Sequence, residues 1–65
     1  MKVRYFADTD TLLITLSDKA VVETHDLGEN SVVDLDAAGR VVAITLEHAR
    51  DQTDISEFSY QTADA

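Results

Sequence analysis

The sequence predicts a mostly β protein, at the border with the α+β class: a single antiparallel meander of four or five strands with a short C-terminal helical turn. Three observations lead to this fold. Apolar and polar residues alternate with a period of two, as they do when successive side chains point to opposite faces of a strand. The alternating segments are rich in Val, Ile and Thr, whose branched side chains suit a pleated sheet better than a helix. Turn-forming residues interrupt the alternation about every 8 to 12 residues.

The first two strands are marked by apolar residues two positions apart. In the segment 2–6 these are Val3 and Tyr5, after which the stretch ADTDT breaks the alternation with residues that favour turns. In the segment 11–17 three apolar side chains share one face: Leu12, Ile14 and Leu16. The stretch SDKA then marks the next reversal of the chain.

The remaining strands differ in how strongly they alternate. The segment 20–26 alternates weakly, as a half-exposed strand does, and the segment 31–36 follows after the break GEN. The segment 40–47 has apolar or small residues on both faces: Val41, Ala43 and Thr45 on one, Val42, Ile44 and Leu46 on the other. A strand of this kind is covered on both sides.

The C-terminal part of the chain combines a helix signal with an ambiguous tail. The stretch EHARD, residues 47–51, contains helix formers and predicts a helical turn. The tail, residues 52–60, fits a short helix capped by Thr53 or Asp54. It fits equally a strand over residues 55–60, because its residues alternate there. Of the two we expect the short helical turn.

The stretch DLDAAGR, residues 34–40, fits either a cation-binding loop or a chain reversal. Asp34, Asp36 and Gly39 match the first, third and sixth positions of a calcium loop. The fifth, ninth and twelfth positions hold residues that cannot supply the expected ligands: Ala38, Val42 and Thr45. A β-hairpin needs only Gly39, as the left-handed residue of a type I turn followed by a bulge. We therefore predict a hairpin with Gly39 as its turn glycine.

Charge and composition exclude several classes of protein. The chain has 13 acidic and 5 basic residues, a formal net charge of -8, which repels phosphate backbones and anionic lipids. We therefore expect neither nucleic acid nor membrane as a partner. The sequence has no Cys, and so no disulfide or thiolate metal site. The first residues resemble a strand rather than a signal peptide, so we expect a cytoplasmic protein.

The remaining polar residues complete no catalytic, cofactor or metal motif. Asp8 and Asp10 resemble a metal or acid–base pair, but Asp in a turn-rich stretch more often bonds its own backbone. His25 precedes Asp26, and His48 follows Glu47. The two histidines would form a metal or general-base site only if the fold brought them together. The serines lie in no nucleophile motif. We therefore predict no catalytic, cofactor-binding or metal site.

The short chain indicates self-association. We expect one domain over residues 1–60 and a disordered tail over 61–65. A single sheet in 65 residues has too little material to cover both of its faces, so a second copy is expected to cover one of them. The candidate contacts are Phe6, Leu13, Val41, Ala43 and Thr45. The alternative is that the chain's own tail folds back over this face, with Ile55, Phe58 and Tyr60.

Two stretches, YFADTDTLLITL (5–16) and VVDLDAAGRVVAITLEHA (32–49), resemble a small prokaryotic family catalogued as domain of unknown function 2283. The matching residues are Tyr5, Asp8, Asp10, Leu12, Ile14, Leu16, Asp36, Gly39, Arg40, Val41, Val42, Ile44 and Ala49. The departures are Phe6 for the usual Asp, Leu13 for Tyr, Ala43 for Gly and Thr45 for Glu. The resemblance implies a compact β domain without an assigned activity.

These observations predict a small, acidic, non-catalytic binding or assembly module that forms a homodimer or higher oligomer. One alternative is an antitoxin-like or regulatory protein that covers a basic partner protein, which its charge and size allow. A second alternative is a small metal-binding or hydrolytic protein that uses Asp8, Asp10, His25 or His48.

Overall fold

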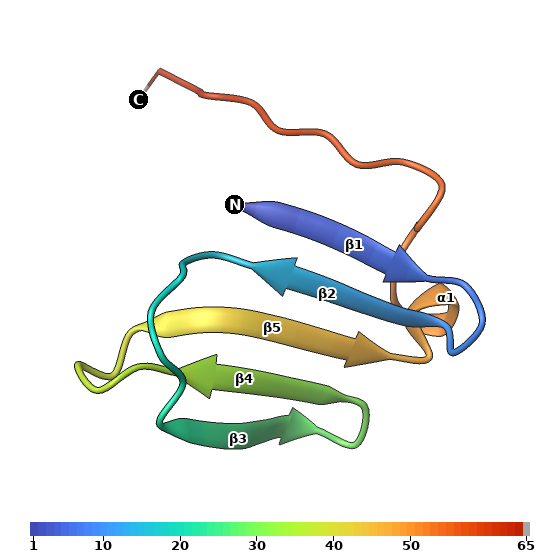
Figure 1. Cartoon of the computed structure of the whole chain (residues 1–65). Coiled ribbons are helices and arrows are strands. Elements are labelled where there is room, and N and C mark those ends of the chain that lie inside the picture. The colour runs from blue at the N-terminus through green and yellow to red at the C-terminus, as the bar shows by residue number, and fades with distance from the viewer. Residues whose placement is uncertain (65) are drawn as a thin grey trace.

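The alternating segments form the five strands of one antiparallel sheet, followed by a single turn of helix (Figure 1). The computed structural model describes residues 1–64. The elements are β1 (Lys2–Phe6), β2 (Thr11–Thr15), β3 (Glu23–Gly28), β4 (Ser31–Leu35), β5 (Val41–Glu47) and α1 (Ala49–Gln52). The predicted fold class, a mostly β chain with one antiparallel sheet and a short C-terminal helix, is confirmed.

The order of the strands in the sheet is β1-β2-β5-β4-β3, which corrects the expected meander at one connection. Residues 16–22 carry the chain from β2 along the end of β5 and β4 to the far edge, instead of turning directly into a neighbour (Figure 1). The composition of the strands explains this order. The strand that is apolar on both faces, β5, takes the centre, and the fully exposed β3 takes an edge.

The same connection moves two predicted strand boundaries. After β2 the amides of Leu16 and Ser17 both donate to the carbonyl of Val42, at 2.7 and 3.3 Å, so regular pairing ends at Thr15. The connecting residues then reach β4, where the amide of Val22 donates to the carbonyl of Leu35 at 2.9 Å. Strand β3 therefore starts three residues later than predicted, at Glu23.

The C-terminal tail forms neither the second helical turn nor the strand that the sequence allowed. Thr53 closes α1 instead of capping a new helix, because its hydroxyl donates to the carbonyl of Ala49 at 3.0 Å. The carboxylate of Asp54 accepts the amide of Ser56 at 3.1 Å in a local turn. Beyond it the described residues to 64 have no helix or strand. The expected disordered end, 61–65, lies in part outside the described residues.

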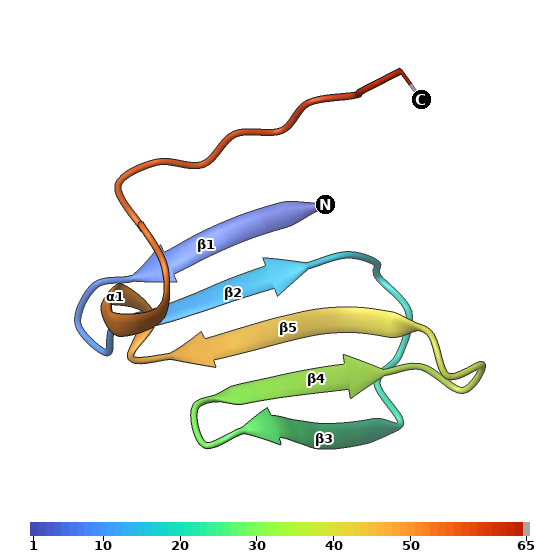
Figure 2. The same ribbon diagram turned by 180° about the vertical axis from the view of Figure 1, so that it is seen from behind.

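The sheet is one layer thick over most of its area. Helix α1 and the start of the tail lie on one side of it, at the β1–β2 end (Figure 2). The described residues form a slab of 34 × 33 × 19 Å with a radius of gyration of 12.8 Å. A compact chain of this length has about 11 Å. Four hydrophobic residues are buried, Val33, Val42, Ala43 and Ala49, and no large side chain among the described residues is fully buried.

Candidate functional site

The strand register sorts the side chains of the sheet onto two unlike faces. Directly paired residues in an antiparallel sheet share a face, and neighbours along a strand alternate. What we call the apolar face consists of Val3, Tyr5, Leu12, Ile14, Val33, Leu35, Val42, Ile44 and Leu46, with Ser31, Glu23 and His25 towards its β3 edge. A register shift pairs Leu35 with Val41, so at this point the faces are assigned from the alternation along each strand. What we call the mixed face consists of Lys2, Arg4, Phe6, Thr11, Leu13, Thr15, Thr24, Asp26, Val32, Asp34, Val41, Ala43, Thr45 and Glu47.

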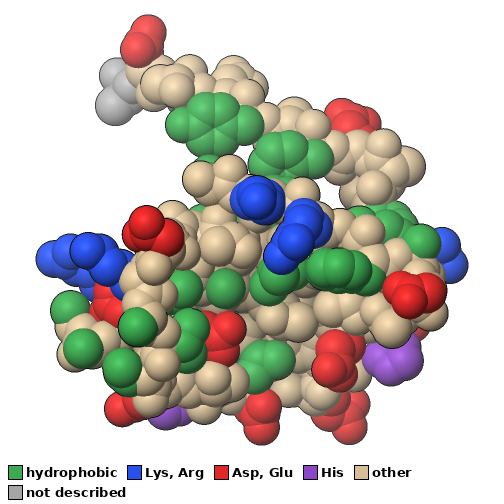
Figure 3. Space-filling model, in the orientation of Figure 1, with side chains coloured by type: hydrophobic (Ala, Val, Ile, Leu, Met, Phe, Trp, Pro, Cys, Tyr) green, Lys and Arg blue, Asp and Glu red, His purple; other side chains and the backbone are tan. Residues whose placement is uncertain are grey.

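The five predicted contact residues all lie on the mixed face. Phe6 and Val41 are exposed, Leu13 and Thr45 are half-buried, and Ala43 is buried within the sheet. Figure 3 looks onto this face, where Lys and Arg side chains gather over β1 and acidic side chains towards β3 and β4. Contact of these five residues with a second copy stays a prediction, and the opposite, apolar face is the competing candidate for that contact. All except Val41 are also positions where the chain departs from the pattern of the family that it resembles.

The apolar face is covered by the chain's own residues at one end only. Ile55 and Phe58 of the tail line a pocket together with Val3, Tyr5 and Leu12 at the β1–β2 end. Over the rest of the face, each strand makes its extensive contacts only with its neighbours in the sheet, within the described part of the chain. Figure 2 shows α1 and the tail leaving the β5–β4–β3 part of the sheet open. Most of the apolar side chains are therefore only half-buried.

The acidic turn between β1 and β2 has a structural role through Asp10. This residue adopts a left-handed conformation, with φ at 54°. Its carboxylate accepts the hydroxyl of Tyr5 at 2.7 Å and the amide of Arg50 at 3.1 Å. Its carbonyl accepts the amide of Ala49 at 2.9 Å, and the guanidinium of Arg50 lies 5.8 Å from the centre of the Tyr5 ring. The Asp10 carboxylate thus attaches α1 to the β1–β2 turn.

The charges in this cluster follow from the same contacts. The hydrogen bond from Tyr5, helped by the Arg50 amide and guanidinium, holds the pKa of the Asp10 carboxyl below its ordinary value. The hydrogen bond to Asp10 and partial desolvation raise the pKa of the Tyr5 phenol, because both favour its neutral form. Asp10 is therefore an ionised anchor rather than a proton carrier at neutral pH, and its carboxylate bonds Tyr5 and the Arg50 amide.

The two histidines are not brought together. His25 lies on the edge strand β3, where its Nε2 is 2.7 Å from a carboxylate oxygen of Glu23. His48 directly follows β5, which lies two strands away from β3 in the sheet. The residue of β5 that lies level with His25 is Ile44, so His48 is also displaced along the strand. Two strand spacings alone separate them by about 10 Å. Within residues 1–64 no group of three or more His, Cys, Asp or Glu side chains is placed to hold a metal ion.

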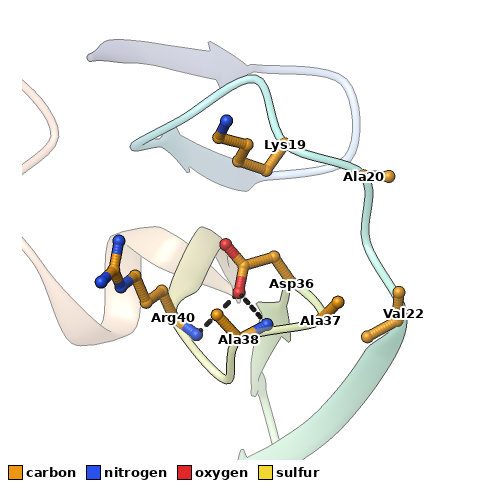
Figure 4. A pocket seen from close by; sticks show the side chains of 7 residues that line it. All are labelled: Lys19, Ala20, Val22, Asp36, Ala37, Ala38 and Arg40. Carbon is orange, nitrogen blue, oxygen red and sulfur yellow. Dashed lines mark hydrogen bonds between the residues drawn. The ribbon is translucent and has the colours of Figure 1, made fainter.

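The stretch DLDAAGR is a β-hairpin turn that uses its carboxylates internally (Figure 4). One carboxylate oxygen of Asp36 accepts the amides of Ala38 and Arg40, both at 2.9 Å. Gly39 has φ at 79°, the left-handed conformation that glycine adopts freely. On β4, Asp34 accepts the hydroxyl of Thr24 at 2.7 Å. Asp36 therefore shapes the hairpin turn and Asp34 links β4 to the edge strand β3, instead of forming a cage around a cation.

A shallow hollow lies between this turn and the connection from β2 to β3, and Figure 4 shows the side chains around it. Its lining includes Lys19, Asp36 and Arg40, with small apolar residues between them. The Asp36 oxygen that faces the turn is already taken by backbone amides. The hollow therefore adds no catalytic arrangement to the turn.

Sequence reasoning missed the contacts between Tyr5, Asp10 and α1. The signal was present in the resemblance, which includes Tyr5, Asp10 and Ala49 among its matching positions. The alternation of the first strand identifies Tyr5 only as an apolar residue, although its hydroxyl needs a partner when its ring is half-buried. Ala49 is fully buried under the end of the sheet, which explains why a small residue stands there.

Comparison with known proteins gives a family but no function. The family described as "Protein of unknown function (DUF2283)" has a model that matches residues 2–50. The matched segment contains all five strands and both turn carboxylates, Asp10 and Asp36, and ends within α1. No curated protein and no solved structure matches the chain. No helix among the described residues is both long and apolar enough to span a bilayer.

Proposed function

This chain belongs to the family of proteins of unknown function DUF2283, and we propose that it is a non-catalytic assembly module whose apolar face packs against the same face of a second copy. The observation that carries the proposal is the open apolar face: nine apolar side chains share it, and the chain's own helix and tail cover only its β1–β2 end. Ordinary sheets of this kind bury such a face against a second layer.

The exposed area of the chain supports a second layer supplied by another molecule. The accessible surface is 5085 Å². A folded monomer of this mass exposes about 4,100 Å². The surplus is about 1,000 Å², and a specific protein–protein interface of standard size buries about 800 Å² on each partner. One chain therefore exposes an excess comparable to what one stable interface would remove.

The chemistry of the two faces favours the apolar one. Two sheets packed face to face lie about 10 Å apart with their side chains interdigitated, which suits a surface without charges at its centre. The mixed face carries charged side chains near both edges: Lys2 and Arg4 on β1, Asp26 and Asp34 on the opposite strands. Pairing through the apolar face leaves these charges in water, where they keep the assembly soluble.

Two further expectations belong to this proposal. A cytoplasmic location fits a chain without cysteine. The net charge of -8 fits a partner other than nucleic acid or lipid. The antitoxin-like role on a basic protein stays a prediction from the charge, and no contact in the described part of the chain adds to it.

The proposal is tested by a matched pair of substitutions, Leu12→Gln and Leu13→Gln. These adjacent leucines of β2 are both half-buried and lie on opposite faces. We expect the unmodified chain to be a dimer by sedimentation equilibrium, and we expect L12Q to shift it towards monomer much more than L13Q does, with circular dichroism used to verify that both variants fold. A larger effect of L13Q would assign assembly to the mixed face. A monomeric unmodified chain at micromolar concentration would refute self-assembly.

A further inference from the structure

We infer that residues 55–60 act as an arm that packs against the second copy, with Phe58 and Tyr60 as its contact residues; this rests on the proposed function. The arm leaves the end of α1 on the side of the apolar face and runs back beside β1 (Figures 1 and 2). Its first apolar residue, Ile55, is half-buried near Tyr5 and Leu12 of its own chain. The arm is thus fixed at its base and projects beyond it.

The outer part of the arm has few attachments to its own chain. Among residues 57–64 no backbone amide or carbonyl bonds to the rest of the described chain. Phe58 is 65% exposed and Tyr60 is 74% exposed, so both rings keep most of their apolar area in water. Aromatic side chains of this size contribute strongly to interfaces when they are buried.

An open apolar slot separates the arm from its own strand. Met1 and Val3 line one side of the slot, Phe58 and Tyr60 line the other, and its volume is about 500 Å³. Figure 3 shows the opening between the arm and the body of the molecule. The aromatic rings therefore point towards the sheet without packing closely on it, and there is room for side chains from another molecule.

Continuity with the apolar face points to a second copy as the occupant. Val3 belongs both to the slot and to the apolar face, so a sheet that packs on that face also reaches the slot. In a pair with two-fold symmetry each chain supplies one arm and one slot, so each contact is made twice. Asp54, just before the arm, and Glu57 within it are exposed, and both stay in water in such a pair. The arm therefore enlarges an interface that the apolar face begins.

The arm is tested with a fluorescent residue, because the chain has no Trp. We expect the indole in a Tyr60→Trp variant to be shielded from iodide quenching at high protein concentration, and to become accessible on dilution along with the loss of dimer mass. The matched control is Phe6→Trp, an exposed aromatic position on the opposite face, whose quenching should not follow the mass.

A second measurement gives the energetic contribution of the arm. We expect the double substitution Phe58→Ser and Tyr60→Ser to raise the dimer dissociation constant at least about tenfold, and Phe6→Ser to change it much less. A dimer in which the indole of Y60W is equally quenched at all concentrations, and which the double substitution does not weaken, would overturn the arm and leave the proposed function standing. An unmodified chain that is monomeric throughout would overturn both.

Discussion

At the scale of single residues, the carboxylates that looked most like catalytic candidates are those that the backbone uses. Asp10 accepts a phenol and an amide of α1, and Asp36 accepts two amides of its own turn. Short polar side chains commonly fix turns in this way. A sequence pattern of Asp and Gly is therefore weak support for chemistry unless several ligand positions agree.

The Asp10 contacts predict a loss of stability in acid. The pKa of Asp10 is lower in the folded chain than its ordinary value of 3.8. Its contribution to the free energy of unfolding is therefore present above pH 3.8, and it is lost as the pH falls through the pKa of the folded state. Tyr5→Phe removes the largest cause of that shift. We expect Y5F to raise the pKa of Asp10 in a carboxyl NMR titration and to lower the melting temperature at pH 7. An unchanged Asp10 titration in Y5F would contradict this assignment.

The hydrogen bond between Tyr5 and Asp10 also predicts a loss of stability at alkaline pH. The pKa of Tyr5 is raised above its ordinary value of 10.0, so the contribution of its neutral phenol is present below pH 10.0 and is lost as the pH rises through the folded value. We expect ultraviolet titration to show that the pKa of Tyr5 lies above 10.0, and we expect Asp10→Asn to lower it. Asp8→Asn is the control, since Asp8 makes no hydrogen bond to Tyr5 among the described residues.

The two glycines allow a matched test of the hairpin turn. Gly39 is left-handed, with φ at 79°, whereas Gly28 is not, and an added methyl group would meet no neighbour within 4 Å at either position. We expect Gly39→Ala to lower the free energy of unfolding by about 1 kcal/mol through backbone strain. Gly28→Ala should be neutral or slightly stabilising. Equal effects in urea unfolding would show that the conformation of Gly39 is not what the turn requires.

At the scale of elements, the sequence predicted which segments form strands better than it predicted which strands lie next to each other in the sheet. The period of two identified all five strands, and β5, which has apolar residues on both faces, takes the centre of the sheet. The order could not be predicted, because residues 16–22 carry no signal that distinguishes a tight turn from a crossing connection. The tail was predicted wrongly because Thr53 and Asp54 bond locally, to Ala49 and Ser56, instead of capping a helix.

Helix α1 depends on its contacts, since four residues are too few to be helical on their own. Ala49 is fully buried and its amide donates to Asp10. We expect Ala49→Leu to cost about 1 to 3 kcal/mol by overpacking. Ala20→Leu, at an exposed position of the connection between β2 and β3, should have little effect. Equal melting temperatures for the two variants would argue against tight packing of α1.

At the scale of the whole molecule, the described residues are less compact than an ordinary domain of this length. Their radius of gyration of 12.8 Å and their surplus of exposed surface fit a sheet that is one layer thick and carries an extended, exposed tail. Chain length and alternation predict that a second copy covers one face, and this stays a prediction. They were insufficient to select the face, since Val41, Ala43 and Thr45 look as apolar in sequence as the row opposite. The charges that neighbouring strands add to the mixed face appear only once the register is known.

The most direct test of the central claim is an isotope-filtered NOE experiment on dimers mixed from labelled and unlabelled chains. Packing through the apolar face predicts contacts between chains from methyl groups of that face, such as Ile14, Val33 and Ile44. The methyl groups of Leu13 and Val32, on the mixed face, should show none. Contacts between chains that come from Leu13 and Val32 but not from Ile44 would contradict the account.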